Sequence, residues 1–174
     1  MALLQIAEPD MAGAPHQRNI AIGIDLGTTN SLVATVKSGE ATVLADIHGA
    51  KLIPSIVNYA ADNVQVGTQA QKLRISDPAN TLVSIKRFMG RSFADLNPEV
   101  TYPYKFVAKT GNIQINTRSG IKDPVQVSAD ILQYLRTVAV EAMGEEPTGV
   151  VITVPAYFDD AQRQATKQAG ELAG

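Results

Sequence analysis

The sequence predicts an α/β protein in which one β-sheet with flanking helices is interrupted by a smaller α+β insertion. Residues 20–24 and 32–36 are two runs rich in apolar side chains, separated by a polar turn, which is typical of a β-hairpin. Residues 150–154 are continuously apolar, which predicts a central strand covered on both faces. Amphipathic helical patterns precede and follow that strand, at 128–143 and 159–172.

The elements before the first long helix are predicted from short patterns. The isoleucines of 20–24 share one strand face, and a turn at Ser38 and Gly39 leads into a third strand over 40–44. From 54 to 124, Gly, Pro and Asn punctuate short apolar runs, which predicts a small α+β insertion. Its expected elements are strands at 55–59 and 64–66, helices at 68–75 and 82–88, and strands near Phe106 and at 113–115.

The two long helices are predicted from their ends and their apolar stripes. Ser128 is the expected N-cap of the first helix, and Gly144 its C-terminal stop. Asp159 or Asp160 is expected to begin the second. The residues expected to face the core are Ile131, Leu132, Leu135, Val138, Ala139, Ala142 and Met143 in the first helix, and Ala161, Ala165, Ala169 and Leu172 in the second.

The composition argues against several classes of function. Fifteen Lys and Arg against seventeen Asp and Glu give a net charge of −2, which offers no electrostatic basis for binding nucleic acid or an anionic membrane. No apolar run approaches the roughly 20 residues of a membrane span. The sequence has no Cys, which removes disulfides and thiolate catalysis and fits a reducing compartment. Residues 1–19 lack the basic start of a signal peptide and are expected to form a flexible tail.

The turn of the hairpin carries groups suited to a nucleotide phosphate. Gly27 allows a ligand to approach the backbone amides, which can form an anion-binding nest. Short side-chain donors follow at Thr28, Thr29, Asn30 and Ser31. Asp25, at the end of the first strand, is a hard oxygen ligand of the kind that magnesium accepts, directly or through water. The turn therefore points to ATP.

Other interpretations of this turn remain open on local chemistry alone. The turn lacks the Gly-x-x-x-x-Gly-Lys-Ser/Thr pattern of a P-loop, and a strand follows it. Gly23 and Gly27 have neither the spacing nor the following helix of a dinucleotide-binding fingerprint. An ordinary polar hairpin with an Asx-type turn would account for the same residues equally well.

Four blocks of sequence resemble the heat-shock protein 70 family of chaperone ATPases, also called the DnaK type. They follow the order and spacing of that family from residue 20 to the end of the chain. The blocks are DLGTTNS at 25–31, PSIV at 54–57, NTLVSIKRFMG at 80–90 and VITVPAYFDDAQRQATK at 151–167. This resemblance favours the nucleotide interpretation of the turn over an ordinary hairpin.

Finer features resemble a specialised bacterial branch of the family that serves iron–sulfur cluster assembly. They are the N-terminal stretch 1–18, the string SLVATV at 31–36, and Asp159, where general members usually carry Asn. The resemblance implies a bacterial cytoplasmic protein with two partners, a J-type co-chaperone and an iron–sulfur scaffold protein. A general DnaK-type folding chaperone is the alternative within the family.

The family resemblance implies an actin-like ATPase fold with a ribonuclease H-like motif, in which two lobes enclose ATP or ADP with magnesium. This chain would supply lobe I only. Residues 20–53 and 125–174 would form the sheet subdomain of that lobe, and residues 54–124 an inserted small subdomain. The flexible tail at 1–19 would precede them.

The resemblance also implies roles for residues of the turn. Gly27, Thr28, Thr29 and Asn30 match the family's phosphate-binding residues. Asp25 matches the acid that holds magnesium through water.

Further roles are implied for residues outside the turn. Lys86 matches a lysine that stabilises charge during phosphoryl transfer, with Arg87 either supporting it or pairing with a carboxylate. The residues that match an interdomain switch are Pro155, Tyr157, Asp160 and Arg163. Without the family blocks, Lys86 would be an ordinary solvated lysine, Pro155 would simply end a strand, and Arg163 would lie on a solvated helix face.

Several parts of a family ATPase follow position 174 in chain order. They are a glutamate after the next strand, a second phosphate loop with its aspartate, the adenosine-binding lobe and the peptide-binding domain. This chain would therefore enclose no metal or cofactor fully. Because positioning and electrostatics supply most of the catalysis of phosphoryl transfer, we expect the isolated chain to bind ATP weakly and not to hydrolyse it appreciably.

Two other classes of function share this fold. A small-metabolite kinase would need only the hairpin, but it is not expected to share the blocks around Lys86 and Pro155. An actin-like filament protein would use the nucleotide to govern assembly, which sedimentation with and without ATP would reveal.

Overall fold

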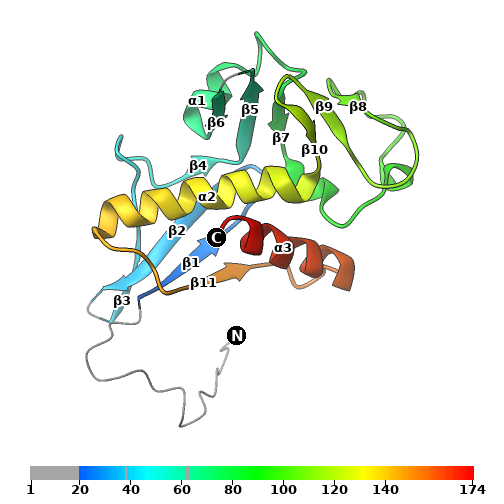
Figure 1. The fold of residues 1–174 in the computed structure, drawn as a ribbon. Coiled ribbons are helices and arrows are strands. Elements are labelled where there is room, and N and C mark those ends of the chain that lie inside the picture. Colours follow the sequence, from blue (N-terminus) through cyan, green and yellow to red (C-terminus); the bar gives the residue numbers. More distant parts are fainter. Residues whose placement is uncertain (1–19, 38, 62) are drawn as a thin grey trace.

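The computed structural model describes residues 20–37, 39–61 and 63–174; the predicted tail lies outside the described residues. The larger sheet of this part has five strands (Figure 1), which are β1 (Ala21–Asp25), β2 (Asn30–Lys37), β3 (Glu40–Val43), β4 (Ile53–Pro54) and β11 (Gly149–Thr153). Their order is β11-β1-β2-β3, and β4 pairs with the start of β2. β1 and β2 form the predicted antiparallel hairpin, whereas β11 runs parallel to β1.

Two helices, α2 (Pro124–Met143) and α3 (Asp160–Leu172), accompany this sheet (Figure 1). α2 packs on β1 and β2, and α3 packs beside α2. The shared core contains Ile22, Ile24 and Val33 from the strands and Ile131, Leu132, Leu135, Val138 and Ala139 from α2. The predicted stripe of the first helix is thus confirmed over most of its length, while Ala142 near its end is exposed.

The insertion between β4 and α2 contains two small sheets, which lie on the opposite side of α2 from β11 in Figure 1. One sheet has the order β6 (Asn63–Val66), β5 (Ile56–Ala60), β7 (Thr81–Val83), with α1 (Thr68–Lys72) packed on β5. The other has the order β10 (Gly120–Lys122), β9 (Ile115–Thr117), β8 (Lys105–Phe106). The 3₁₀ helices η2 (Ile85–Phe88) and η3 (Phe93–Asp95) lie between them in sequence. An aromatic cluster joins these parts through Phe88, Phe93, Tyr102, Tyr104 and Phe106.

The start of α2 differs from the prediction. Asp123, not Ser128, is the N-cap: its carboxylate accepts a hydrogen bond from the Gln126 amide (2.8 Å), and the Asp123 amide donates one to the Gln126 Oε1 (3.1 Å). Pro124 occupies the first turn, where its fixed φ suits a helix and its missing N–H costs nothing. Ser128 is instead buried, with its Oγ 3.2 Å from the Sδ of Met89.

The strand β11 also differs from the prediction. Among the described strands it pairs with β1 alone, and Val150 and Val151 are 48% and 54% exposed. An apolar run indicates that its side chains favour burial, but whether they are buried depends on which elements pack against the strand.

The buried face of α3 is only partly the predicted one. Ala165 and Ala169 are buried as expected, but Ala161 is exposed and Leu172 is 63% exposed. The other buried residues, Gln162 and Thr166, can face the core because they satisfy their hydrogen bonds inside the helix. Gln162 completes the N-terminal capping box, and the Thr166 hydroxyl donates to the Gln162 carbonyl (2.9 Å).

The expected helix over 82–88 is divided in the structure. Residues 81–83 form β7 and pair with β5, and the chain then turns at Ser84, which has a left-handed conformation (φ 54°). Only the following four residues are helical, as η2. The sequence also gave no indication of β10, and the helix expected at 68–75 ends at Lys72.

One buried tyrosine connects the insertion to α2. Tyr59 of β5 is inaccessible to solvent, and its hydroxyl donates a hydrogen bond to the Asp130 carboxylate of α2. The Lys122 ammonium lies 4.9 Å from the centre of the Tyr59 ring. Burial, followed by the negative charge of Asp130, raises the pKa of the Tyr59 hydroxyl, so this group stays a proton donor.

The helices of the described residues include none that is both long and apolar enough to cross a membrane.

We expect Tyr59→Phe to lower the free energy of unfolding by about 1–3 kcal/mol, because it leaves the half-buried Asp130 carboxylate without its donor. Urea unfolding of the chain would measure the change. Tyr157→Phe is the matched control, since Tyr157 is 83% exposed, and should change stability by less than about 0.5 kcal/mol. Equal effects of the two substitutions would contradict the assigned role of the Tyr59 hydroxyl.

Candidate functional site

The turn between β1 and β2 is held in place by two serines. The Gly27 amide donates to the Ser31 Oγ (3.1 Å), and Ser31 Oγ lies 2.8 Å from the Ser55 Oγ. The Ser55 amide in turn donates to the Thr29 carbonyl (2.8 Å). Ser31 was expected to be a short side-chain donor for phosphate, but it is buried and holds the turn together through its hydrogen bonds. Ser55, which follows β4, had no predicted role.

Gly27 is required by a close approach within the turn. A Cβ at this position would lie 1.9 Å from the Asn30 carbonyl oxygen, far inside van der Waals contact. The turn can therefore fold back on itself only without a side chain here. Beside Gly27, Thr28 is half-buried, and Thr29 and Asn30 are exposed, so the short donors lie at an open surface.

Asp25 ends β1 beside the end of β11. Because the two strands are parallel, their carboxyl ends lie at the same edge of the sheet, and Asp25 pairs in register with Thr153. The Thr153 hydroxyl donates to the Asp25 Oδ1 (3.1 Å). Asp25 is exposed and retains its second carboxylate oxygen for a ligand. Among the described residues no group of three or more His, Cys, Asp and Glu side chains could hold a metal ion directly.

Lys86 approaches this edge from the insertion. Its side chain is half-buried, and its Nζ lies 5.4 Å from the centre of the Phe158 ring. Burial lowers the pKa of the Lys86 ammonium, and the Asp25 carboxylate partly opposes this effect. Lys86 thus lies at the turn that follows β11, whose paired strand β1 ends in Asp25, so the fold brings together segments that are distant in sequence. Arg87 next to Lys86 is exposed.

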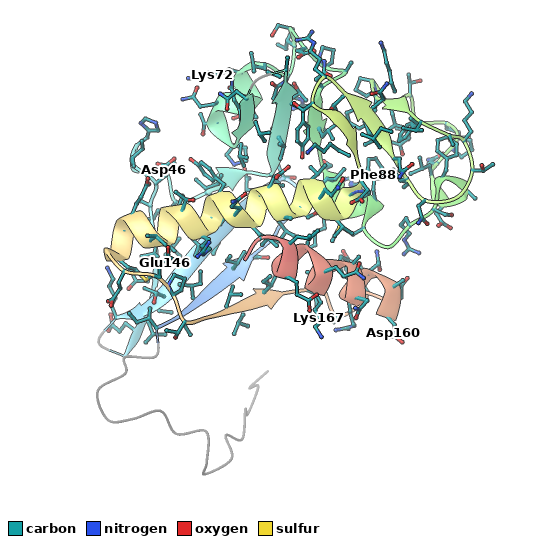
Figure 2. All side chains as sticks on the ribbon, viewed as in Figure 1. Asp46, Lys72, Phe88, Glu146, Asp160 and Lys167 are labelled. Carbon is teal, nitrogen blue, oxygen red and sulfur yellow. The ribbon has the colours of Figure 1, made fainter. Side chains whose placement is uncertain are left out.

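The backbone before Lys86 is fixed by a tyrosine of the insertion. The Val83 amide donates to the Tyr104 Oη (3.0 Å), and the Tyr104 hydroxyl donates to the Val83 carbonyl (3.3 Å). Ser84 then takes its left-handed conformation, which costs a non-glycine residue about 1–3 kcal/mol. After Lys86, Phe88 lies buried in the aromatic cluster, where the insertion meets the N-terminal end of α2 (Figure 2).

The segment between β11 and α3 is a turn braced by Arg163. The Arg163 Nε donates to the Phe158 carbonyl (3.1 Å), and its Nη2 donates to the Ala156 carbonyl (3.2 Å). The Phe158 amide donates to the Pro155 carbonyl (3.1 Å). The predicted switch residues are therefore neighbours. Tyr157 is exposed at the top of this turn, and Asp160 begins α3 (Figure 2).

Phe158 and Thr153 contact predicted site residues without having been predicted themselves. Both fall inside the family-like block at 151–167, and that block was the available signal. The strict order of strand, proline and aromatic pair could have suggested that Phe158 packs against another part of the site.

The fold and this site define the class of protein to which the chain belongs. The sequence profile of the family described as Hsp70 protein matches residues 21–174, and the chain is a member of the Hsp70 family. Membership implies the actin-like ATPase fold and nucleotide binding with magnesium. The mixed α/β architecture is consistent with that fold.

Within the family, the chain is similar to chaperones of the HscA type. It is 59% identical over its whole length to a chaperone protein HscA homolog of Laribacter hongkongensis and to one of Chromobacterium violaceum. It is 58% identical to the corresponding protein of Methylobacillus flagellatus. The chain spans 28% of the length of each of these relatives. The predicted resemblance to the iron–sulfur branch is thus confirmed as a likeness to HscA homologues.

We expect Gly27→Ala to lower the free energy of unfolding by about 1–3 kcal/mol, since the new methyl group must displace the Asn30 carbonyl. Urea unfolding would measure the loss, and backbone NMR shifts would show the turn changing shape. Gly23→Ala in β1 is the control, because a Cβ there meets nothing within 4 Å. A Gly27→Ala chain as stable as Gly23→Ala would show that the turn has another conformation available.

We expect the Lys86 ammonium to titrate below the ordinary lysine value of 10.5, and Asp25→Asn to lower its pKa further by removing the opposing charge. NMR titration of the Lys86 side chain would measure both. Because the unfolded chain binds more protons between the folded and unfolded pKa values, the free energy of unfolding should rise with pH through that window. Asp46→Asn is the control, and an Asp25→Asn chain with an unchanged Lys86 pKa would contradict the assigned proximity.

Proposed function

We propose that the chain forms lobe I of the ATPase domain of an HscA-like chaperone, which couples ATP binding and hydrolysis to client binding in iron–sulfur cluster assembly. The proposal is carried by one observation: Lys86 lies against Phe158 in the turn that follows β11, at the sheet edge where the paired strand β1 ends in Asp25, beside a turn that only glycine at position 27 allows. Family membership supports a nucleotide as the ligand of this arrangement.

The residues of the turn fit the phosphates of a magnesium nucleotide. Gly27 lets the turn fold back on itself, and the short donor side chains of Thr28, Thr29 and Asn30 follow it, with Thr28 half-buried and the other two exposed. Asp25 would hold the magnesium through water, since proteins usually bind a magnesium nucleotide with only one or two carboxylates and leave several waters on the ion. When bound, magnesium supplies positive charge that neutralises the phosphate oxygens.

Lys86 has the features of a residue that stabilises charge in phosphoryl transfer. It extends from the insertion toward the carboxyl end of β1, and partial burial strengthens its electrostatic effect. Phe158 restricts its side chain by lying against the ammonium. Arg87, which is exposed, would support Lys86 by adding positive charge at longer range.

The Pro155–Arg163 turn has the features of the proposed interdomain switch. Pro155 lies two residues after the end of β11, whose neighbour β1 ends in Asp25. Arg163 fixes the turn through two carbonyl oxygens, while Tyr157 and Asp160 remain exposed to a partner domain. A change in the bound nucleotide would thus alter the exposed surface formed by Tyr157 and Asp160.

The division of the chain into subdomains is part of the same proposal. Residues 20–53 and 125–174 would form the sheet subdomain of lobe I, and 54–124 the inserted subdomain that carries Lys86. A J-type co-chaperone and an iron–sulfur scaffold protein are the proposed partners in the bacterial cytoplasm. The names of the relatives support a chaperone of the HscA type.

Single-turnover hydrolysis by the complete protein that carries this chain tests the catalytic role. We expect Lys86→Ala to leave ATP affinity largely intact and to slow hydrolysis by roughly two orders of magnitude or more, since it removes charge stabilisation but not the turn. Lys72→Ala on the exposed surface of α1 (Figure 2) is the matched control and should hydrolyse ATP at the normal rate.

Calorimetry on the 174-residue chain tests the proposal that lobe I alone is incompetent. Micromolar binding of magnesium ATP by the isolated chain would contradict it. A normal single-turnover rate in the Lys86→Ala protein would remove Lys86 from the mechanism. Binding of an iron–sulfur scaffold protein, but not of general unfolded clients, would support the HscA-like function over a general folding chaperone.

A further inference from the structure

Gly90 makes an unusually close contact with the start of α3. It follows η2 and has a left-handed conformation, with φ at +65°. A Cβ built at Gly90 would lie 2.7 Å from the Gln162 nitrogen, 2.8 Å from the Ala161 carbonyl carbon and 2.9 Å from the Gln162 Cα. All three are backbone atoms, so no side-chain rotation could make room for a methyl group.

The contact joins the two segments to which the proposed function gives separate roles. On one side, Gly90 lies four residues after Lys86, and the intervening Phe88 and Met89 are buried. Met89 is further fixed by its contact with Ser128 of α2. The chain between Lys86 and Gly90 is therefore too firmly packed to absorb a displacement at its end.

On the other side, the first turn of α3 is tied to the Pro155–Phe158 turn. Gln162 exchanges two capping hydrogen bonds with Asp159 (2.9 and 3.2 Å). The next residue, Arg163, holds the carbonyls of Ala156 and Phe158. A shift of the α3 backbone at Gln162 would thus move the turn and the Phe158 ring that lies against Lys86.

The other contacts between these segments are weaker constraints. Arg91 and Asp159 form an ion pair at 3.4 Å, but both side chains are 40% or more exposed, and such pairs contribute little. The contact between Lys86 and Phe158 involves a flexible four-carbon stem. The backbone contact at Gly90 is the stiff one, because closely packed backbone atoms have no alternative rotamers.

We propose that Gly90 is a positioning residue: its missing side chain lets the Lys86 segment pack on the backbone of the first turn of α3, and this contact sets where Lys86 lies relative to Asp25 and Phe158. The catalytic consequence rests on the proposed function. The contact itself does not.

The chain offers a matched control for conformational strain. Gly111 also has a left-handed conformation (φ +71°) and lies in the same insertion, but a Cβ there meets nothing within 4 Å. Gly90→Ala and Gly111→Ala therefore impose the same kind of backbone strain, and only Gly90→Ala forces two segments apart. Any difference in hydrolysis or hydrogen exchange between the two variants is therefore due to the contact between Gly90 and α3.

The first measurement is single-turnover ATP hydrolysis and ATP affinity in the complete protein that carries this chain. Gly90→Ala should slow hydrolysis by about 10- to 100-fold, the effect of a displacement near 1 Å, with ATP affinity changed by less than about threefold. Affinity is retained because the atoms that a methyl group at Gly90 would displace belong to Ala161 and Gln162, not to the Thr28–Thr29 turn. Gly111→Ala should behave as the unmodified protein. Equal slowing by both variants, or a normal rate in Gly90→Ala, would overturn the proposal.

The second measurement is hydrogen exchange in the same complete protein, which needs no catalysis. Gly90→Ala should speed exchange at least tenfold in the peptides covering 86–91 and 155–163, and Gly111→Ala should not. If the unmodified protein hydrolyses no ATP, the proposed function fails. The exchange measurement still shows whether the Gly90 contact holds the two segments together. If Gly90→Ala does not fold, exchange in the unmodified protein decides it. The proposal then requires the segments 86–91 and 155–163 to lose their protection from exchange together. Loss of protection in one segment alone would overturn the proposal.

Discussion

The parallel pairing of β1 with β11 is the constraint on which the rest of the site depends. It is a long-range pairing, joining Asp25 to Thr153 across 128 residues, and it places the ends of both strands at one edge of the sheet. The hairpin turn begins where β1 ends, and the Pro155 turn begins where β11 ends. Parallel strands need a crossover, and α2 with the strands and loops before it supplies one, covering the sheet as it returns. Without this register the proposed phosphate-binding turn and the proposed switch would be unrelated surface loops.

Lys86 reaches the same edge by a different route, through the insertion and not through the main sheet. The hydrogen bonds between Tyr104 and Val83 fix β7, Ser84 turns the chain, and Phe88 enters the aromatic cluster. The insertion is itself attached to α2 through buried Tyr59 and its bond to Asp130. The position of Lys86 therefore depends on the packing of side chains between layers.

The sequence predicted those parts of the fold that local patterns determine. The β1–β2 hairpin follows from alternation and a small turn, and α2 follows from its apolar stripe. The start of α2 was wrong because Pro124 was taken to end the insertion, although Asp123 and Pro124 together form a helix start. The exposure of β11 could not be predicted, since an apolar run does not reveal which elements cover it. The proximity of Lys86 to Asp25 depends on the docking of the insertion, so local patterns could not predict it, and only the family resemblance implied it.

The two routes meet at the turn that follows β11, and this meeting point matters for how a nucleotide signal would travel under the proposed function. The hydrogen bond from the Thr153 hydroxyl to the Asp25 carboxylate, together with the backbone ladder between β1 and β11, connects the end of β1 to the Pro155 turn. The Lys86 side meets the same turn at Phe158 and, through Gly90, at the first turn of α3. The turn thus lies between two firm supports, the β1–β11 ladder and the close backbone contact at Gly90. Under the proposed function, a change in the charge that Lys86 faces would reach this turn from both supports, and Tyr157 and Asp160 are the exposed side chains through which a partner domain would detect it.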